Sequence, residues 1–270
     1  MVVQHNLSAM NTNRQMGVVT SALQKSTEKL SSGYKINRAG DDAAGLSISE
    51  KMRSQIRGLN KASDNAQDGI SLIQVAEGAL NETHSILQRM NELATQAAND
   101  TNTSVDRQSI KDEIEQLNEE LDRISTTTQF NKQDLLTGGF SGKLQVGALE
   151  GQTMDVKISL AVSANGLNVS AVEVSTNVKA GAAMQSIQDA IESVSKQRSK
   201  LGAIQNRLEH TINNLDTNAE NTQAAESRIR DTDMADEMVQ YSKNNILSQA
   251  GQSMLAQANQ QTQGVLSLLG

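Results

Sequence analysis

The chain of 270 residues contains no cysteine, no proline and no tryptophan. Without cysteine it has no disulfide framework, no thiolate metal site and no cysteine nucleophile. Only four aromatic residues occur, Tyr34, Phe130, Phe140 and Tyr241, although aromatic side chains dominate many cores and pockets. The composition therefore disfavours a compact enzyme and favours elements that pack with few bulky side chains.

Long apolar runs and basic clusters are also missing. No apolar run approaches the roughly 18 residues of a membrane-spanning helix, and the opening MVVQHNLSAM lacks the basic and apolar segments of a cleaved secretory signal. The 24 basic and 31 acidic residues give a formal net charge of −7, which disfavours nucleic-acid binding. We expect neither nucleic acid nor a membrane as a partner.

Two regions of helical periodicity flank a region with period two. Apolar residues recur every three or four positions from Met52 to Ala97, which predicts a helix starting near Asp41–Asp42 and running for about 50 residues or more. A second helix is predicted through Ile110–Ile124, after a turn at 99–102. A further long helix is predicted by the spacing between Met184 and Leu215.

The middle of the chain alternates apolar and polar residues. Leu144, Val146 and Ala148 alternate before Glu150–Gly151, and Met154, Val156, Ile158 and Leu160 alternate after it. This pattern predicts a β-hairpin. Asn165–Gly166 predicts another turn, followed by a short strand over 167–171.

The two ends are weakly apolar and rich in Asn, Gln, Ser and Ala. We assign to a C-terminal assembly seam Leu247, Ala250, Met254, Ala258, Val265 and Leu268, which follow one another at helical spacing. Leu7 and Met10 are assigned to the same assembly surface. Such helices are marginal alone, so their apolar faces need a partner. The expected partner of each end is the other end.

These patterns predict a mainly α fold: a long antiparallel helical rod or coiled-coil bundle with a small β-hairpin region in the middle of the chain. No residue is predicted to be catalytic, and neither a cofactor nor a metal ion is expected, since the three histidines lie far apart in sequence. The segment 40–47 resembles a phosphate-binding loop, but Leu46 replaces the lysine. A helix start with Asp41 or Asp42 as N-cap is favoured instead.

Several ordered motifs resemble bacterial flagellin. They are Leu30-Ser-Ser-Gly33, Ile36-Asn37, Asp41-Asp-Ala-Ala-Gly45-Leu46, Gln88-Arg89, Glu92-Leu93-Ala94, Gln129-Phe130-Asn131, Leu201-Gly-Ala-Ile-Gln-Asn-Arg207, Ser227-Arg-Ile229, Ala256-Gln-Ala-Asn259 and Val265-Leu-Ser-Leu-Leu269. The resemblance covers roughly 1–140 and 180–270. Because few residues separate these two arms, the chain resembles a short flagellin without a large outer domain.

The resemblance implies a structural subunit that assembles with copies of itself into a helical homopolymer, the flagellar filament. Residues 1–36 with 235–270 would form the inner filament core, and 37–140 with 179–234 the long-helix bundle of the outer core, which also holds the β region 141–178. Implied partners are hook-associated and cap proteins and a flagellin export chaperone. The implied location is the extracellular flagellum, reached without a cleaved signal peptide.

The resemblance also implies a receptor surface. Gln88, Arg89, Leu93 and Glu113 match positions that flagellins present to vertebrate Toll-like receptor 5. Arg89, Leu93 and Glu113 are expected to offer a cation, an apolar contact and an anion on one ridge. Asn91 is a departure, since many receptor-active members have a second arginine there.

Two alternatives remain at this point. One is a hook–filament junction protein of the same family. The other is a cytoplasmic signalling coiled coil, which would need continuous heptads through the middle of the chain. The predicted β segment interrupts them.

Overall fold

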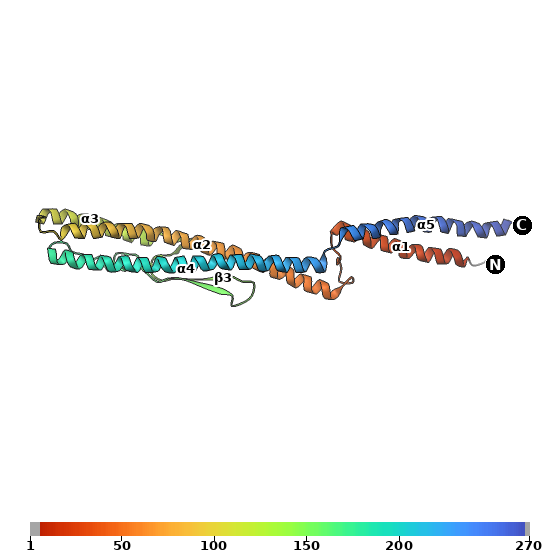
Figure 1. Ribbon diagram of the computed structural model, residues 1–270, viewed down its shortest axis with the longest axis horizontal. Helices are drawn as coiled ribbons and strands as arrows, with labels where there is room; N and C mark the ends of the chain where they lie inside the picture. Colours follow the sequence, from red (N-terminus) through yellow and green to blue (C-terminus); the bar gives the residue numbers. More distant parts are fainter. Residues whose placement is uncertain (1–5, 268–270) are drawn as a thin grey trace. The chain divides into compact units, whose positions relative to one another are not determined.

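The computed structural model describes residues 6–267, and helices dominate it (Figure 1). The helices are α1 (Leu7–Ser32), α2 (Ala43–Ala97), α3 (Ser104–Thr127), α4 (Asn177–Arg230) and α5 (Met234–Ser267). The strands are β1 (Gln129–Phe130), β2 (Gln133–Asp134), β3 (Phe140–Gln145) and β4 (Thr153–Ile158), paired antiparallel as β1–β2 and β3–β4. The predicted fold class, a helical bundle with few strands in mid-chain, is confirmed.

The chain divides into two compact units. The central unit comprises residues 55–220, and the terminal unit comprises, among the described residues, 6–54 and 221–267. The long helices α2 and α4 contribute residues to both units.

The central unit owes its core to the apolar positions of α2 and α4. Buried residues of these helices include Ala66, Ile73, Ala76, Leu80, Leu87, Met90, Ala180, Ile187, Val194, Leu201 and Leu208. Thr83 is also buried, and its hydroxyl donates to the Ala79 carbonyl at 2.9 Å. That bond satisfies the one polar group of Thr83 that the helix would otherwise leave without a partner. Small and aliphatic residues thus supply the core that the scarce aromatics do not.

Helix α3 begins with a reciprocal capping box. The Asp106 amide donates to Oγ1 of Thr103 at 3.3 Å, while the Thr103 amide donates to Oδ2 of Asp106 at 2.9 Å. These bonds satisfy backbone donors that a helix start leaves free. The Thr103 hydroxyl, followed by the Thr103 amide, lowers the pKa of Asp106.

The predicted hairpin is present as β3–β4, with Leu144 paired to Met154. The predicted strand over 167–171 is wrong. The amides of Val169 and Ser170 both donate to the Ala164 carbonyl, at 2.9 and 3.1 Å, which folds this segment into compact turns. The alternation arises because these turns bury Leu167 and Val169 in the core.

The β1–β2 pair was not predicted from the sequence. Its two-residue turn is Asn131–Lys132, and both residues have positive φ, 49° and 64°. Two-residue hairpin turns in which both residues have positive φ usually contain glycine, which makes them recognisable in a sequence. The turn here contains none, so its sequence signal is weak.

In the terminal unit, α1 and α5 lie side by side and antiparallel (Figure 1). The Asn6 side-chain amide donates to the Ala258 carbonyl at 2.8 Å, and Lys29 forms an ion pair with Glu237 at 3.4 Å. Helix α1 ends at Gly33, whose φ of 76° is the left-handed conformation that glycine adopts without strain.

The connection from α1 to α2 is held by two aspartates. Asp42 is the N-cap of α2, since its Oδ1 accepts from the Gly45 amide at 2.9 Å. Asp41 instead accepts from the backbone amides of Arg38 and Asn37, and the Arg38 amide is the main cause of its lowered pKa. Of the two predicted caps, Asp42 is therefore the one that caps the helix.

Substituting Leu80, which is fully buried in the central unit, tests the importance of this core. We expect Leu80→Ala to lower the free energy of unfolding by about 2–5 kcal/mol, because it removes apolar contacts and leaves a cavity. The matched control is Val75→Ala on the same helix, whose side chain is 41% exposed. It should change stability by less than about 0.5 kcal/mol. Urea unfolding followed by circular dichroism measures both, and equal effects would contradict this account of the core.

Candidate functional site

Large apolar side chains are exposed mainly in the terminal unit. Among the described residues, ten of the fourteen exposed large apolar side chains belong to it. They are Leu7, Met10, Val18, Ile48, Met234, Met238, Val239, Ile246, Leu247 and Met254. Exposed apolar side chains gathered on one part of a protein mark an interaction surface.

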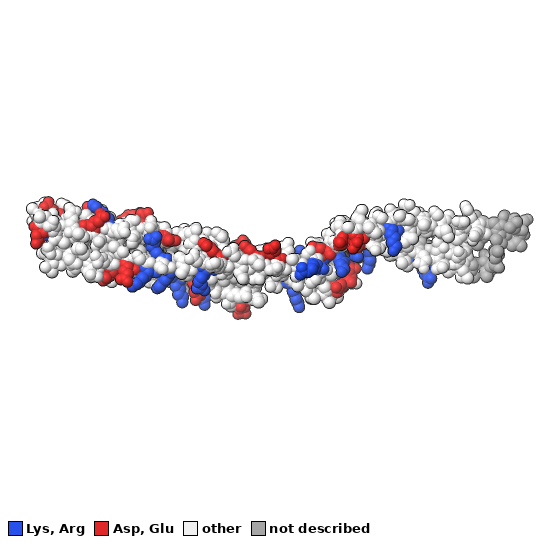
Figure 2. Space-filling view, in the orientation of Figure 1, with Lys and Arg blue, Asp and Glu red and all other residues white. Residues whose placement is uncertain are grey.

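Charges are scarce on the same helices. Arg14 is the only charged residue within 6–24, and none occurs within 244–267. Figure 2 shows the corresponding stretch as almost free of blue and red. A surface of this kind has little charge to desolvate when a partner surface covers it, so apolar burial there is opposed by a small electrostatic penalty.

The face of α5 that packs on α1 differs from the predicted seam. Among the α5 residues up to 261, the half-buried or buried positions are Glu237, Tyr241, Asn244, Asn245, Ser248, Gly251, Leu255 and Ala258. A Cβ placed on Gly251 would lie 3.9 Å from Cγ of Met16, in ordinary van der Waals contact, so Gly251 faces α1. The prediction that the seam residues pair with the N-terminal segment is therefore wrong for Leu247, Ala250 and Met254, which are exposed.

The assembly residues thus fall into three groups. Leu7 and Met10 of α1 are 70% and 64% exposed, and Leu247 and Met254 of α5 are 44% and 59% exposed. Ala250 is exposed beside them, whereas Ala258 is buried against α1. Leu268 lies outside the described residues, and the side chain of Val265 lies outside them too.

Arg89 is held on the surface of the central unit by two carboxylates. Its Nε and Nη2 lie 3.0 and 2.9 Å from Oε1 of Glu113 on α3, and its Nη1 lies 3.2 Å from Oε2 of Glu92 on its own helix. The hydrogen bond to Glu113, followed by that to Glu92, raises the pKa of Arg89. All three side chains remain exposed, so the guanidinium is oriented and still accessible. Gln88 is exposed next to it, 3.0 Å from the His84 ring.

Leu93 does not lie on that ridge. Its side chain is only 2% exposed and belongs to the core of the central unit. A step of four residues turns about 40° around a helix axis, which is enough to carry Leu93 from the exposed position of Arg89 into the core. The expectation that Leu93 offers an exposed apolar contact is therefore wrong.

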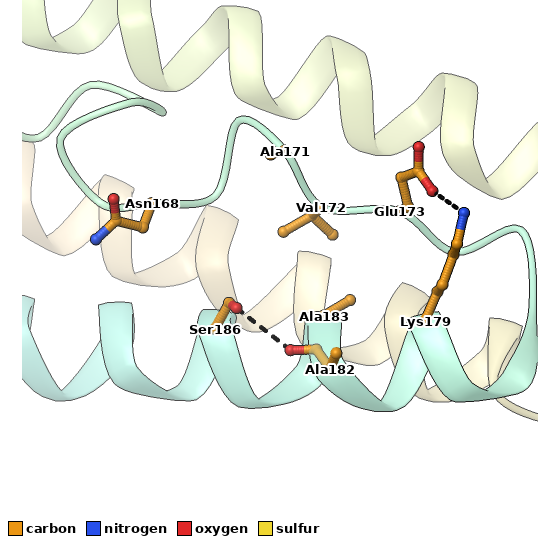
Figure 3. Close-up of a pocket in the computed structure, with 8 residues that line it drawn as sticks. All are labelled: Asn168, Ala171, Val172, Glu173, Lys179, Ala182, Ala183 and Ser186. Atoms are coloured by element: carbon orange, nitrogen blue, oxygen red, sulfur yellow. Dashed lines mark hydrogen bonds and ion pairs between the residues drawn. The ribbon is translucent and has the colours of Figure 1, made fainter.

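A groove of about 310 Å³ lies between the loop that precedes α4 and the first turns of α4 (Figure 3). An ion pair between Glu173 and Lys179 crosses one end of it. The Ser186 hydroxyl donates to the Ala182 carbonyl at 3.3 Å, within its own helix. No histidine is among the residues that line the groove, so nothing there activates that hydroxyl as a nucleophile.

The described residues contain neither a cluster of metal ligands nor a membrane-spanning helix. Within 6–267, no three His, Asp or Glu side chains come together as a metal site would require. No helix in the same part of the chain combines the length and apolarity needed to span a bilayer.

Sequence reasoning missed several exposed apolar residues. Val18, Val239 and Ile246 are 62%, 67% and 67% exposed. Ile246 adjoins Leu247, so the exposed surface of α5 is wider than a single seam. The adjacent large aliphatic residues Ile246 and Leu247 are the signal in the sequence that could have indicated this wider exposed surface.

Comparison with known proteins gives matches over both arms of the chain. Residues 3–141 match the family described as bacterial flagellin N-terminal helical region, and residues 184–269 match the bacterial flagellin C-terminal helical region. The flagellin of Halalkalibacterium halodurans is 56% identical and that of Bacillus subtilis is 52% identical, each over the whole of both chains. The crystal structure of Bacillus cereus flagellin superposes with a TM-score of 0.51 at 32% identity, covering 60% of this chain and 94% of that one.

The matches at both arms, the full-length identity and the shared helical bundle agree with one another. This chain belongs to the bacterial flagellin family.

Proposed function

We propose that this chain is the structural subunit of a bacterial flagellar filament, which it builds by helical self-assembly. The observation that carries this proposal is the apolar, charge-poor surface of the terminal unit. Identities of 56% and 52% over the full length of two proteins named flagellin support it over a hook–filament junction protein. The contact between α1 and α5 leaves most of their large apolar side chains exposed. Other copies of the chain would cover these side chains in a filament.

Membership of the flagellin family supports a location in the extracellular flagellar filament. We further propose export without a cleaved signal peptide, with a flagellin export chaperone covering the apolar surface beforehand and hook-associated and cap proteins contacting the subunit in the flagellum. In the filament, 1–36 with 235–270 would form the inner core. The outer core would comprise 37–140, 179–234 and the β region 141–178.

Two polar substitutions on α5 test self-assembly. Ile246→Gln combined with Leu247→Gln should abolish filaments, because each side chain contributes about 1.5–3 kcal/mol when fully buried. Both are exposed in the single chain, so its fold should persist. The control is Val178→Gln, whose side chain is 83% exposed in the central unit. Electron microscopy and sedimentation score the filaments, and normal filaments from the double variant would refute this role of α5.

Amide hydrogen exchange tests the weakness of the terminal unit. Among the described residues of the terminal unit, Ile36 and Ala258 are the only hydrophobic residues that are buried. We expect fast exchange in α1 and α5 of the monomer and slow exchange over 70–90 and 187–208, because opening free energy follows buried apolar contact. After polymerisation the terminal helices should become protected. Equal protection of both units in the monomer would contradict this.

A second candidate function is recognition of the monomer by Toll-like receptor 5. The observation that favours it is the exposed Arg89, which Glu113 and Glu92 hold in one orientation. An oriented arginine loses little conformational freedom when a partner binds it. Arg89, Gln88 and Glu113 would contact the receptor, while Leu93 would support Arg89 from the core.

Binding of the monomer to the receptor ectodomain tests this surface. Arg89→Ala should weaken binding about fivefold or more, as expected of an arginine near the centre of an interface. Arg123→Ala is the matched control, because Arg123 is an exposed arginine on α3 that pairs with Glu120. Leu93→Ala should chiefly lower stability, measured by urea unfolding. Binding of Arg89→Ala equal to that of the unmodified chain would remove Arg89 from the receptor surface.

A further inference from the structure

Positive charge gathers on one flank of the central unit. Residues 193–208 of α4 include four cationic residues and no acidic one. Three of these cations, Lys196, Lys200 and Arg207, are exposed. At about 100° per residue, their positions fall within about 40° of one another around the helix axis. They therefore form one cationic row along the outside of α4.

The outer face of the β3–β4 hairpin extends this row. Alternate residues of β4 are buried, so Lys157 between them points outward, and Lys143 of β3 is exposed as well. The buried Gln197 donates its side-chain amide to the Lys157 carbonyl at 3.3 Å, which places β4 against α4. Lys200 follows Gln197 by about 60° around the α4 axis, so it borders that contact. We call the five exposed cations the basic flank: Lys143, Lys157, Lys196, Lys200 and Arg207.

The cations of the basic flank are accessible and mostly unpaired. Lys196 pairs with Glu192 at 2.6 Å, whereas the other four have no ion-pair partner among residues 6–267. Within the strands β3 and β4, Asp155 is the only acidic residue. The basic flank therefore carries a net positive charge, although the formal net charge of the whole chain is −7.

Helix α3 carries the opposite charge. Residues 112–122 include six acidic residues and no cationic one. Asp112, Glu115 and Glu119 are exposed and fall within about 60° of one another around the helix axis, and we call them the acidic strip. Glu115 pairs with Lys111 at 3.4 Å and Asp112 accepts from the neutral Gln108 amide at 2.7 Å. Glu119 has no ion-pair partner in the described part of the chain, so the strip remains net negative.

The basic flank and the acidic strip lie on different sides of the central unit and match in spacing. In Figure 2, blue side chains gather along the edge where Figure 1 places α4 and β3, and red ones along the edge where α3 lies. Lys200 and Arg207 are one heptad apart, as are Asp112 and Glu119, which separates each pair by about 10.5 Å along its helix. Two aligned helices can therefore bring both pairs together at once.

We infer that the acidic strip of one copy of this chain docks on the basic flank of a second copy. The contact rests on the proposed self-assembly and specifies a surface for it. Copies with a net charge of −7 repel one another, so assembly favours a register in which carboxylates face cations. Each copy can give one contact and receive the other. A head-to-tail contact that does not close into a ring propagates as an open helix.

Charge reversal tests the contact with purified full-length chain, seeded with fragments of unmodified filaments. One double variant combines Lys200→Glu with Arg207→Glu, and the other combines Asp112→Lys with Glu119→Lys. Each should raise the critical concentration for polymerisation about tenfold or more, because like charges would then face each other. All four changes in one chain should restore it to within about threefold, because every contact regains opposite charges.

A control variant separates the flank from a general effect of net charge. Lys51→Glu with Arg57→Glu reverses two exposed cations of α2, which have no ion-pair partner among the described residues, and should leave the critical concentration unchanged. Thermal unfolding should be the same for all variants, because the substituted side chains are exposed. Double variants that polymerise normally, or a fourfold variant no better than the doubles, would overturn the docking contact. Failure of the unmodified chain to form filaments would instead overturn the proposed function.

Cross-linking identifies the two surfaces directly. A carbodiimide joins a lysine amine to a carboxylate as an amide, with loss of water. In filaments grown from a mixture of unlabelled and isotope-labelled chain, mass spectrometry should find Lys200 joined to Asp112 or Glu119 of a copy with the other label. The same cross-links should be missing from the monomer. Filaments in which Lys200 is joined only to carboxylates outside the acidic strip would contradict the inference.

Discussion

The packing of α1 on α5 through small and amide side chains is the constraint on which the proposed function depends. Gly251, Ser248 and Ala258 lie on the face of α5 that is turned toward α1, and the Asn6 amide donates to the Ala258 carbonyl. Because these positions take up the contact, larger side chains such as Ile246 and Met254 remain exposed. The pair is therefore formed but incompletely buried, which is the state a subunit needs before other copies cover it.

The central unit has the opposite character. Its α2 and α4 positions bury Leu80, Ile187 and Leu201 completely, and its surface carries most of the ion pairs, including that between Arg89 and Glu113. A core of this kind is stable without a neighbour. The central unit can therefore present oriented polar groups at fixed spacing, whereas the terminal unit presents apolar area.

Sequence periodicity predicted the long helices well because a helix of this length repeats its apolar spacing many times. The β3–β4 hairpin was equally predictable from alternation around Glu150–Gly151. Alternation misled at 167–171, where turns around Ala164 bury the same residues that a strand would. Leu93 was misplaced because sequence spacing gives only the angle between two side chains around the helix axis. It does not tell which side of the helix faces the core. The α5 seam was misplaced for a related reason. Its contact face mixes residues of many types, from Gly251 to Tyr241 and Leu255, so apolar spacing alone does not identify that face.

Apolar and polar contacts would contribute different properties to a filament. Burial of the apolar terminal surface is non-directional and scales with area, so it supplies affinity but tolerates sliding of one helix along another. Contacts between paired charges and unpartnered hydrogen-bonding groups depend on position and suppress incorrect registers. The charged groups that the central unit holds in fixed positions, such as Arg89 between Glu113 and Glu92, have this second character. Affinity from the terminal helices and register from the central unit together would specify one helical lattice from a single repeated chain.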